Sequence, residues 1–227
     1  MISILLAIRK NSKMFSKWLI AYQKHTRDFS NIELLILVNE EDTWNQDYFD
    51  YYKLKVFREH YNAGAKARHI FYNQLAKEAH GDWLWHMCDD HYLLDGYDEY
   101  LVNYIKEHQI DSTKVNIIVP MVGNSSSISH ILSRGYYDVV GRIGWHGNID
   151  SYLNDVHERM VYQDRIHYPK QPILLDFTVD QTILTPEHNK TGPQNIDMEF
   201  HEFTSEFTRG EIDKDAHKLY EAIKEGR

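Results

Sequence analysis

Residues Gly81–His91 read GDWLWHMCDDH, and this stretch decides the fold. A largely apolar run, Trp83–Met87, follows Gly81-Asp82 and leads through Cys88 into two acids and a histidine. A short apolar run with polar residues on both sides is typical of a strand that is covered on both faces of a parallel sheet. The stretch therefore predicts an inner strand that delivers Asp89, Asp90 and His91 at its carboxyl end.

The same pattern recurs upstream of this stretch. Ile2–Ile8 and Ile32–Val38 are further continuous apolar runs, and Lys55–Phe57 fits a shorter strand. Between them, Phe15–Tyr22 and Ala67–Ala79 repeat apolar residues at the spacing of one buried helix face. This alternation of strands and helices predicts an α/β fold, with a mostly parallel, Rossmann-like sheet and helices on both of its faces.

Downstream, the pattern weakens after a polar, turn-prone break at Gly123–Ser127. We place a soft boundary there, which gives a first part over residues 1–122, a second over 123–190 and a C-terminal extension over 191–227. The remaining elements that the spacing predicts are a helix over Tyr97–Ile105, a strand over Asn116–Val122, a helix over Ser151–Met160, a strand-like stretch over Ile173–Leu184 and a final helix over Ile212–Ile223.

Charge and composition exclude several classes of function. The 227 residues carry a formal net charge of −9, and no run of basic residues is present to follow a phosphate backbone, which argues against duplex nucleic acid as a partner. The apolar start is too short for a transmembrane segment or a signal peptide. The single cysteine, Cys88, permits no internal disulfide and suits a reducing compartment. We therefore expect a cytoplasmic protein.

The acids after Trp83–Met87 predict a metal site. Adjacent carboxylates repel each other unless a cation neutralises them, and Mg²⁺ or Mn²⁺ is commonly held by one or two carboxylates together with substrate phosphates. An imidazole such as His91 favours Mn²⁺ over Mg²⁺. The alternative is a solvated acidic turn. Because ligands of open α/β sheets bind beyond the carboxyl ends of the strands, polar residues after the first two strands are expected at the same edge.

Other segments add a family resemblance. Tyr61–His69 (YNAGAKARH) resembles the Asn-x-Gly-x-x-x-Ala-Arg-Asn segment of family 2 glycosyltransferases. The acidic loop Val38–Asp42 precedes it, and Gly81–His91, which is similar to the family's Asp-x-Asp metal motif, follows in the family's order. The resemblance implies a GT-A fold with a smaller acceptor-side lobe, in which residues 1–122 bind a nucleotide sugar and 123–190 form the acceptor and catalytic part.

A second resemblance concerns the catalytic base. Gly144–Asp150, followed by Asn154-Asp155 and Arg159, is similar to the family's Gly-Gly-Phe-Asp, Glu-Asp and Arg sequence. It implies that Asp155 is the general base, with Asp150 in the same catalytic segment, and that the anomeric centre is inverted. The alternative is a polar helix on which Asp155 and Arg159 form a surface pair at i,i+4 spacing.

The resemblance also implies the binding residues. The donor is a nucleoside-diphosphate sugar, foremost a UDP-sugar, and the residues expected to contact it are Arg9, Asn39, Glu40, Lys66, Arg68 and Asp89. The resemblance assigns Asp90 and His91 as ligands of the ion, Mn²⁺ or Mg²⁺, and adds His188, further along the chain, as another ligand. A solvent-facing position is the alternative for Lys66, Arg68 and His188. The residues identify no acceptor.

Two rival functions stay open. A nucleotidyltransferase also combines a parallel sheet with a metal-binding aspartate, but such enzymes carry a glycine-rich basic loop after the first strand, where this chain reads Arg9-Lys10-Asn11-Ser12. A catalytically silent module that binds a sugar or nucleotide on the same scaffold is the second rival, because fold alone does not guarantee turnover.

Overall fold

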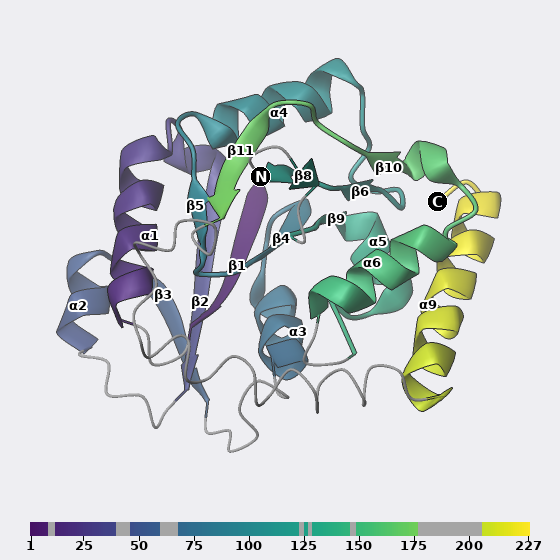
Figure 1. Ribbon diagram of the computed structural model, residues 1–227, viewed down its shortest axis with the longest axis horizontal. Helices are drawn as coiled ribbons and strands as arrows, with labels where there is room; N and C mark the ends of the chain where they lie inside the picture. Colours follow the sequence, from purple (N-terminus) through teal and green to yellow (C-terminus); the bar gives the residue numbers. More distant parts are fainter. Residues whose placement is uncertain are drawn as a thin grey trace.

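The computed structural model describes residues 1–8, 12–39, 46–59, 68–122, 125–126, 129–145, 149–176 and 206–227 (Figure 1). Its helices are α1 (Ser12–His25), η1 (Phe29–Asn31), α2 (Gln46–Tyr51), α3 (Arg68–Glu78), α4 (Tyr97–Glu107), α5 (Arg134–Val140), α6 (Ile149–Arg159), η3 (Gln163–Arg165) and α9 (Glu206–Lys224). Its strands are β1 (Ile2–Ile8), β2 (Ile32–Asn39), β3 (Lys55–Glu59), β4 (Trp83–Met87), β5 (His91–Leu93), β6 (Ile117–Ile118), β7 (Met121–Val122), β8 (Ser125–Ser126), β9 (Ile131–Ser133), β10 (Ile166–His167) and β11 (Pro172–Asp176).

The central sheet has the order β10-β6-β9-β4-β1-β2-β3. Its strands pair in parallel except β9, which runs antiparallel to both β4 and β6. Leu6 of β1 pairs with Met87 of β4. The ends of these two strands therefore lie side by side, and the predicted mostly parallel α/β sheet is confirmed. A second, four-stranded sheet has the order β5-β11-β7-β8.

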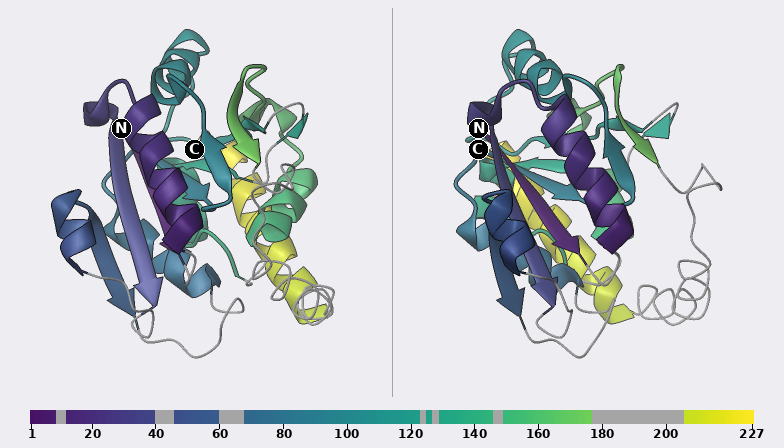
Figure 2. Two further views of the ribbon diagram at one scale, coloured as in Figure 1. Left: turned by 60° about the vertical axis from the view of Figure 1, so that its left-hand side comes forward. Right: turned by 90° about the vertical axis from the view of Figure 1, so that its left-hand side faces the viewer.

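Helices cover both faces of the central sheet (Figures 1 and 2). On one face, Phe15 and Trp18 of α1 are fully buried in an apolar cluster that also takes in Leu101 of α4. On the other face, Leu75 of α3 and Leu219 of α9 belong to a second cluster, to which α5 and α6 contribute further side chains. Both faces of the inner strands are thus buried, which explains why those strands are almost continuously apolar.

The C-terminal helix α9 is tied to the domain by a buried ionic network. Arg142, which follows α5, donates from Nε to Oδ2 of Asp215 at 2.8 Å and from Nη2 to Oε2 of Glu211 at 2.9 Å. The Tyr152 hydroxyl of α6 also donates to Asp215, whose side chain is completely buried. Burial, followed by the nearby Tyr136 and Asp215, raises the pKa of Tyr152, so this hydroxyl remains a donor. The predicted final helix is therefore an integral part of the fold.

One predicted strand differs in the structure. Asn116–Val122 forms two short strands, because β6 joins the central sheet whereas β7 joins the second sheet, and Val119-Pro120 lies between them. Proline has no N–H for a ladder hydrogen bond, which suits a residue at a change of sheet. Among the described residues, no helix combines the length and the apolar character needed to cross a bilayer.

Candidate active site

The candidate site begins where β4 ends. All five residues of β4 are buried, and the chain then turns through Cys88, Asp89 and Asp90 into β5, with the His91 N–H donating to the Cys88 carbonyl at 3.3 Å. Because β4 pairs in parallel with β1, this turn lies at the carboxyl edge of the central sheet. That edge is where open α/β sheets bind their ligands.

Three side chains of this turn form a group of possible metal ligands. Cys88, Asp90 and His91 each place one ligand atom within 4.8 Å of the others. The His91 side chain is 2% exposed. In the described part of the chain, Oδ1 of Asp90 and Nδ1 of His91 are buried without a hydrogen-bond partner. Buried polar atoms nearly always have a partner, so this donor set fits a divalent cation.

A second group shares Cys88 with the first. His86, Cys88 and Asp150 also place one ligand atom each within 4.8 Å of one another. His86 Nδ1 lies 3.3 Å from Oδ1 of Asp150, which comes from the first turn of α6. The fold thus brings one end of α6 against the end of β4. Five polar side chains from two distant segments therefore form one continuous cluster, which we call the β4-end cluster: His86, Cys88, Asp90, His91 and Asp150.

The backbone around His86 is held rigidly by neighbouring side chains and strands. The His86 N–H donates to the His130 carbonyl at 3.1 Å, and the His86 carbonyl accepts from the Ser129 hydroxyl. The Tyr72 ring of α3 packs edge-on against the His86 ring at 4.3 Å, while its hydroxyl donates to the Met87 carbonyl at 2.8 Å. These contacts preorganise the β4-end cluster.

A single amide of α3 fixes the loop that leads toward α6. The Asn73 side chain accepts from the N–H groups of Ile143 and Gly144 at 2.7 and 3.2 Å and donates to the Gly144 carbonyl at 2.9 Å. A Cβ at Gly144 would lie 3.2 Å from the Ile149 side chain, so the loop passes tightly against the start of α6. Asn73 therefore contributes to the position of Asp150.

Asp155 lies on another side of α6. It follows Asp150 by five residues, which places the two carboxylates roughly 140° apart around the helix axis. Burial raises the pKa of Asp155, and the charges that act on it include Arg159 and Arg209. Arg159 forms an ion pair with Asp213 of α9 at 3.1 Å. Asp155 thus belongs to neither group of possible metal ligands and faces the α9 side.

The other predicted contacts are only partly visible. Asp89 lies in the turn after β4 and is partly buried. Asn39 is the last residue of β2 and Arg68 the first of α3, but the side chains of both fall outside the described part of the chain. The remaining four predicted residues also lie outside the described residues: Arg9, Glu40, Lys66 and His188.

The sequence interpretation missed His86 and Cys88 as members of the cluster. Residues two apart on an extended chain point to the same face, so a histidine and a cysteine spaced in this way at a strand end share one side. A histidine inside an otherwise apolar, fully buried strand was the available signal. The contact of this pair with Asp150 depends on the fold and left no trace in the spacing.

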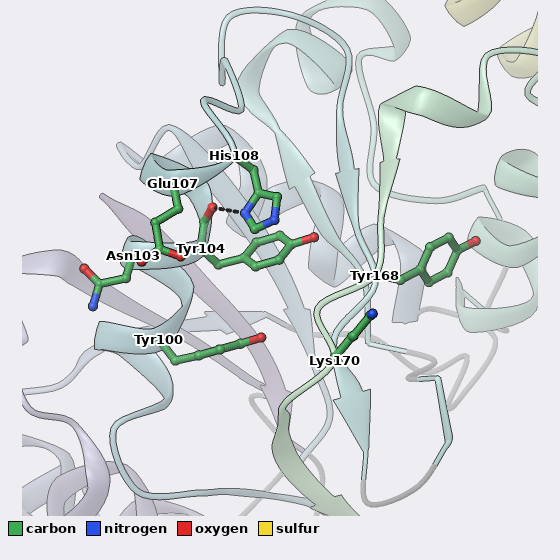
Figure 3. Close-up of a pocket in the computed structure, with 7 residues that line it drawn as sticks. All are labelled: Tyr100, Asn103, Tyr104, Glu107, His108, Tyr168 and Lys170. Atoms are coloured by element: carbon green, nitrogen blue, oxygen red, sulfur yellow. Dashed lines mark hydrogen bonds between the residues drawn. The ribbon is translucent and has the colours of Figure 1, made fainter.

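Two open cavities have no member of the cluster among their lining residues. One, of about 560 Å³, is lined by His69, Ile70, Asn73, Gln74, Lys77, Arg142 and Trp145. The other, of about 570 Å³, lies between α4 and the segment after β10 (Figure 3), and its lining residues are Tyr100, Asn103, Tyr104, Glu107, His108, Tyr168 and Lys170. Figure 1 shows α4 near the start of β1, so this tyrosine-lined groove is at the opposite end of that strand from the cluster.

Comparison with solved structures identifies the fold. TarS 1-349 of S. aureus in complex with UDP superimposes with a TM-score of 0.61 at 13% identity, over 96% of this chain and 70% of that chain. The longer TarS structure gives 0.60 at 13% identity, over 96% of this chain and 42% of its own. Mannosyltransferase PcManGT from Pyrobaculum calidifontis, in complex with GDP-Man and Mn²⁺, gives 0.58 at 12% identity, over 77% of this chain and 56% of its own.

The fold is therefore of the GT-A type, as predicted. No protein-family model and no curated protein matches the sequence. The chain spans only part of the longer TarS structure and of the mannosyltransferase. At 12–13% identity these likenesses establish the architecture and leave the chemistry to the residues of the site.

Proposed function

We propose that this chain is a metal-dependent glycosyltransferase that moves a sugar from a nucleoside-diphosphate sugar to an acceptor hydroxyl. One observation carries the proposal. Asp90 and His91 have buried polar atoms without hydrogen-bond partners in the described structure, and they lie at the carboxyl edge of a GT-A sheet. Cys88 links them to Asp150, because its sulfur belongs to both groups of possible metal ligands. A cation stabilises a diphosphate leaving group, and a nearby carboxylate accepts the proton of an acceptor hydroxyl, so the two together suit sugar transfer.

The donor is proposed to bind across the carboxyl ends of β1, β2 and β4, within residues 1–122. Strand-end loops supply its contacts in open α/β sheets. A UDP-sugar is our first candidate. The residues assigned to it are those at the strand ends and at the start of α3: Arg9, Asn39, Glu40, Lys66, Arg68 and Asp89. Residues 123–190, which include α6, are assigned to the acceptor, and 191–227 form the extension whose helix α9 packs on α5 and α6.

Mn²⁺ or Mg²⁺ is proposed to be held by Asp90 and His91, with His188 as a further candidate ligand. When bound, the ion offsets the negative charge of the leaving diphosphate. Asp90 contributes charge and His91 a neutral nitrogen. Because His91 is almost completely buried, its ring is fixed in place before any ligand arrives.

Asp150 is our preferred general base, with Asp155 as the alternative. Asp150 is partly exposed at 18%, so an acceptor hydroxyl can reach its carboxylate, and it lies next to the ligand group through Cys88. His86 Nδ1 lies 3.3 Å from Oδ1 of Asp150, and we assign to His86 the role of orienting this carboxylate. A carboxylate that takes the acceptor proton in a single displacement gives inversion at the anomeric carbon.

The test is release of free nucleoside diphosphate from a panel of nucleotide sugars in the presence of Mn²⁺. We expect release with at least one donor, and a loss on the order of 100-fold or more in Asp90→Asn and in Asp150→Asn. The matched control is Asp155→Asn, which removes an acid from the same helix and is expected to keep most of the activity. If Asp155→Asn is inactive and Asp150→Asn is active, the base is Asp155.

Two other outcomes replace the proposal. Pyrophosphate release would indicate a nucleotidyltransferase. Binding of a nucleotide sugar without any turnover, across the panel and a range of acceptor sugars, would indicate a silent binding module.

A further inference from the structure

Cys88 stands at the centre of the β4-end cluster. Its sulfur lies within 4.8 Å of the ligand atoms of both Asp90 and His91, and also belongs to the group with His86 and Asp150. Cys88 is partly buried, and it is the only cysteine of the chain. A thiolate is a strong ligand for borderline and soft ions and a poor one for Mg²⁺.

We propose that Cys88 is a third protein ligand of the ion, which makes this a centre with one sulfur, one nitrogen and one oxygen donor. Of the two ions named under the proposed function, such a centre disfavours Mg²⁺, and it binds Zn²⁺ or Co²⁺ more tightly than Mg²⁺. This assignment rests on the proposed function for its role in the reaction. The binding of the ion alone is a separate property, and it is what the experiment below measures.

The donor set and its spacing support a four-coordinate ion. Three protein ligands with one open position are the usual arrangement of a catalytic zinc site, in which the open position takes water or substrate. Ligand atoms at Zn²⁺ bond lengths lie roughly 3.4–3.7 Å apart in a tetrahedron. The three atoms here are already within 4.8 Å of one another, so small side-chain rotations close the site.

The environment of His91 is a second, independent observation. His91 opens β5, where it pairs with Asp176 of β11, and its side chain is 2% exposed. Its Nδ1 has no hydrogen-bond partner in the described structure. Desolvating a ring nitrogen without a partner costs free energy, and coordination to an ion recovers it. Mg²⁺, which prefers six oxygen ligands, gains little from a thiolate and an imidazole.

The experiment is a titration of the full, metal-free chain with Co²⁺, followed by ultraviolet and visible absorption. A thiolate ligand gives a charge-transfer band in the near ultraviolet, and because the chain has one cysteine, that band reports on Cys88 alone. We expect the band in the wild-type protein, its displacement by Zn²⁺, and no displacement by excess Mg²⁺. Cys88→Ser is expected to lack the band and to bind Zn²⁺ at least tenfold more weakly, since even outer-sphere changes cost about 10–100-fold.

Cys88→Asp provides the matched variant, because it restores a charged ligand but with oxygen. It is expected to lack the band and to shift preference toward Mn²⁺ and Mg²⁺, with thermal unfolding of the metal-free protein as the folding control. Co²⁺ binding without the band, or equal Zn²⁺ affinity in wild type and Cys88→Ser, overturns the assignment. If the band forms but no nucleotide sugar is turned over, the metal centre stands and the proposed transferase function is rejected. If nucleotide sugars are turned over but the band is absent, the transferase function stands and Cys88 is rejected as a ligand.

Discussion

Two buried polar regions of this protein differ in how their groups are satisfied. Between α5, α6 and α9 the charged groups are paired, because Arg142 contacts both Asp215 and Glu211 and Asp215 also accepts from Tyr152, although the neighbouring Tyr136 hydroxyl has no hydrogen-bond partner in the described structure. In the β4-end cluster, Asp90 and His91 keep buried polar atoms without hydrogen-bond partners in the described structure. Paired polar groups stabilise the fold. Buried polar groups without a partner have lost their hydration and gained no hydrogen bond in return, so they are suited to bind a ligand. The difference separates a region that stabilises the fold from one that serves a ligand.

The largest expected effect comes from breaking the paired region. Arg142→Met removes the buried cation that pairs with the Asp215 carboxylate, which stays buried. We expect the free energy of unfolding to fall by about 3–5 kcal/mol, measured by urea denaturation. Lys218→Ala is the control, because Lys218 also contacts Asp215, at 3.2 Å, but is half exposed, so a loss below about 1 kcal/mol is expected. Equal losses of unfolding free energy in the two variants would mean that the Arg142 network stabilises the fold no more than an exposed ion pair does.

Asn73→Ala tests the link between the two regions. It leaves the N–H groups of Ile143 and Gly144 without their acceptor, so we expect a loss of about 1–3 kcal/mol in stability. We also expect transferase activity to fall, because the same loop leads toward Asp150. Lys77→Ala, an exposed change on the same helix, is the control for both measurements. Unchanged activity in a folded Asn73→Ala protein would separate the loop from the site.

Gly210→Ala is expected to strengthen the paired region without touching the cluster. Gly210 lies in α9, and a Cβ built there meets nothing within 4 Å. Alanine in place of glycine inside a helix gains roughly 0.5–1 kcal/mol. We expect a higher denaturation midpoint and unchanged ion binding. A lower midpoint would show that α9 needs the freedom of glycine at this position.

The smallest expected effect is a change in pH dependence beside the cluster. Burial lowers the pKa of His157 below its usual 6.5, against the opposing charges of Glu158 and Asp155. The unfolded chain therefore takes up this proton first as pH falls, and stability present above about pH 6.5 is lost below it. His157→Gln should make the drop in melting temperature between about pH 7.5 and pH 5.5 shallower. An equally steep drop would exclude His157 as its source.

The strands of the first half were predictable because burial on both faces leaves long apolar runs. Ile2–Ile8 was predicted with the bounds that the structure has. The two- and three-residue strands β5, β9 and β10 were missed, because such short segments show no period. The antiparallel direction of β9 was missed for the same reason.

The residues of the candidate site also divide into those that a local sequence pattern predicted and those that only the fold brings together. Asp90 and His91 follow a recognisable strand, so sequence order alone placed them together. Asp150 reaches His86 and Cys88 only because the fold brings the start of α6 to the end of β4, and no local pattern encodes this contact between residues more than sixty positions apart. The preference for Asp150 over Asp155 as the general base likewise follows from the folded structure, in which the two carboxylates lie on different sides of α6.

The most direct test of the donor site uses Mn²⁺ as a paramagnetic probe in amide NMR spectra of the full chain, with and without UDP. We predict that signals of residues 88–91 and of Asp150 broaden first and broaden further when UDP is added, while those of Tyr100–His108 beside the tyrosine-lined groove keep their intensity. Broadening centred on α4, or on the exposed acids of α9, with the residues after β4 unaffected, would contradict the proposed site.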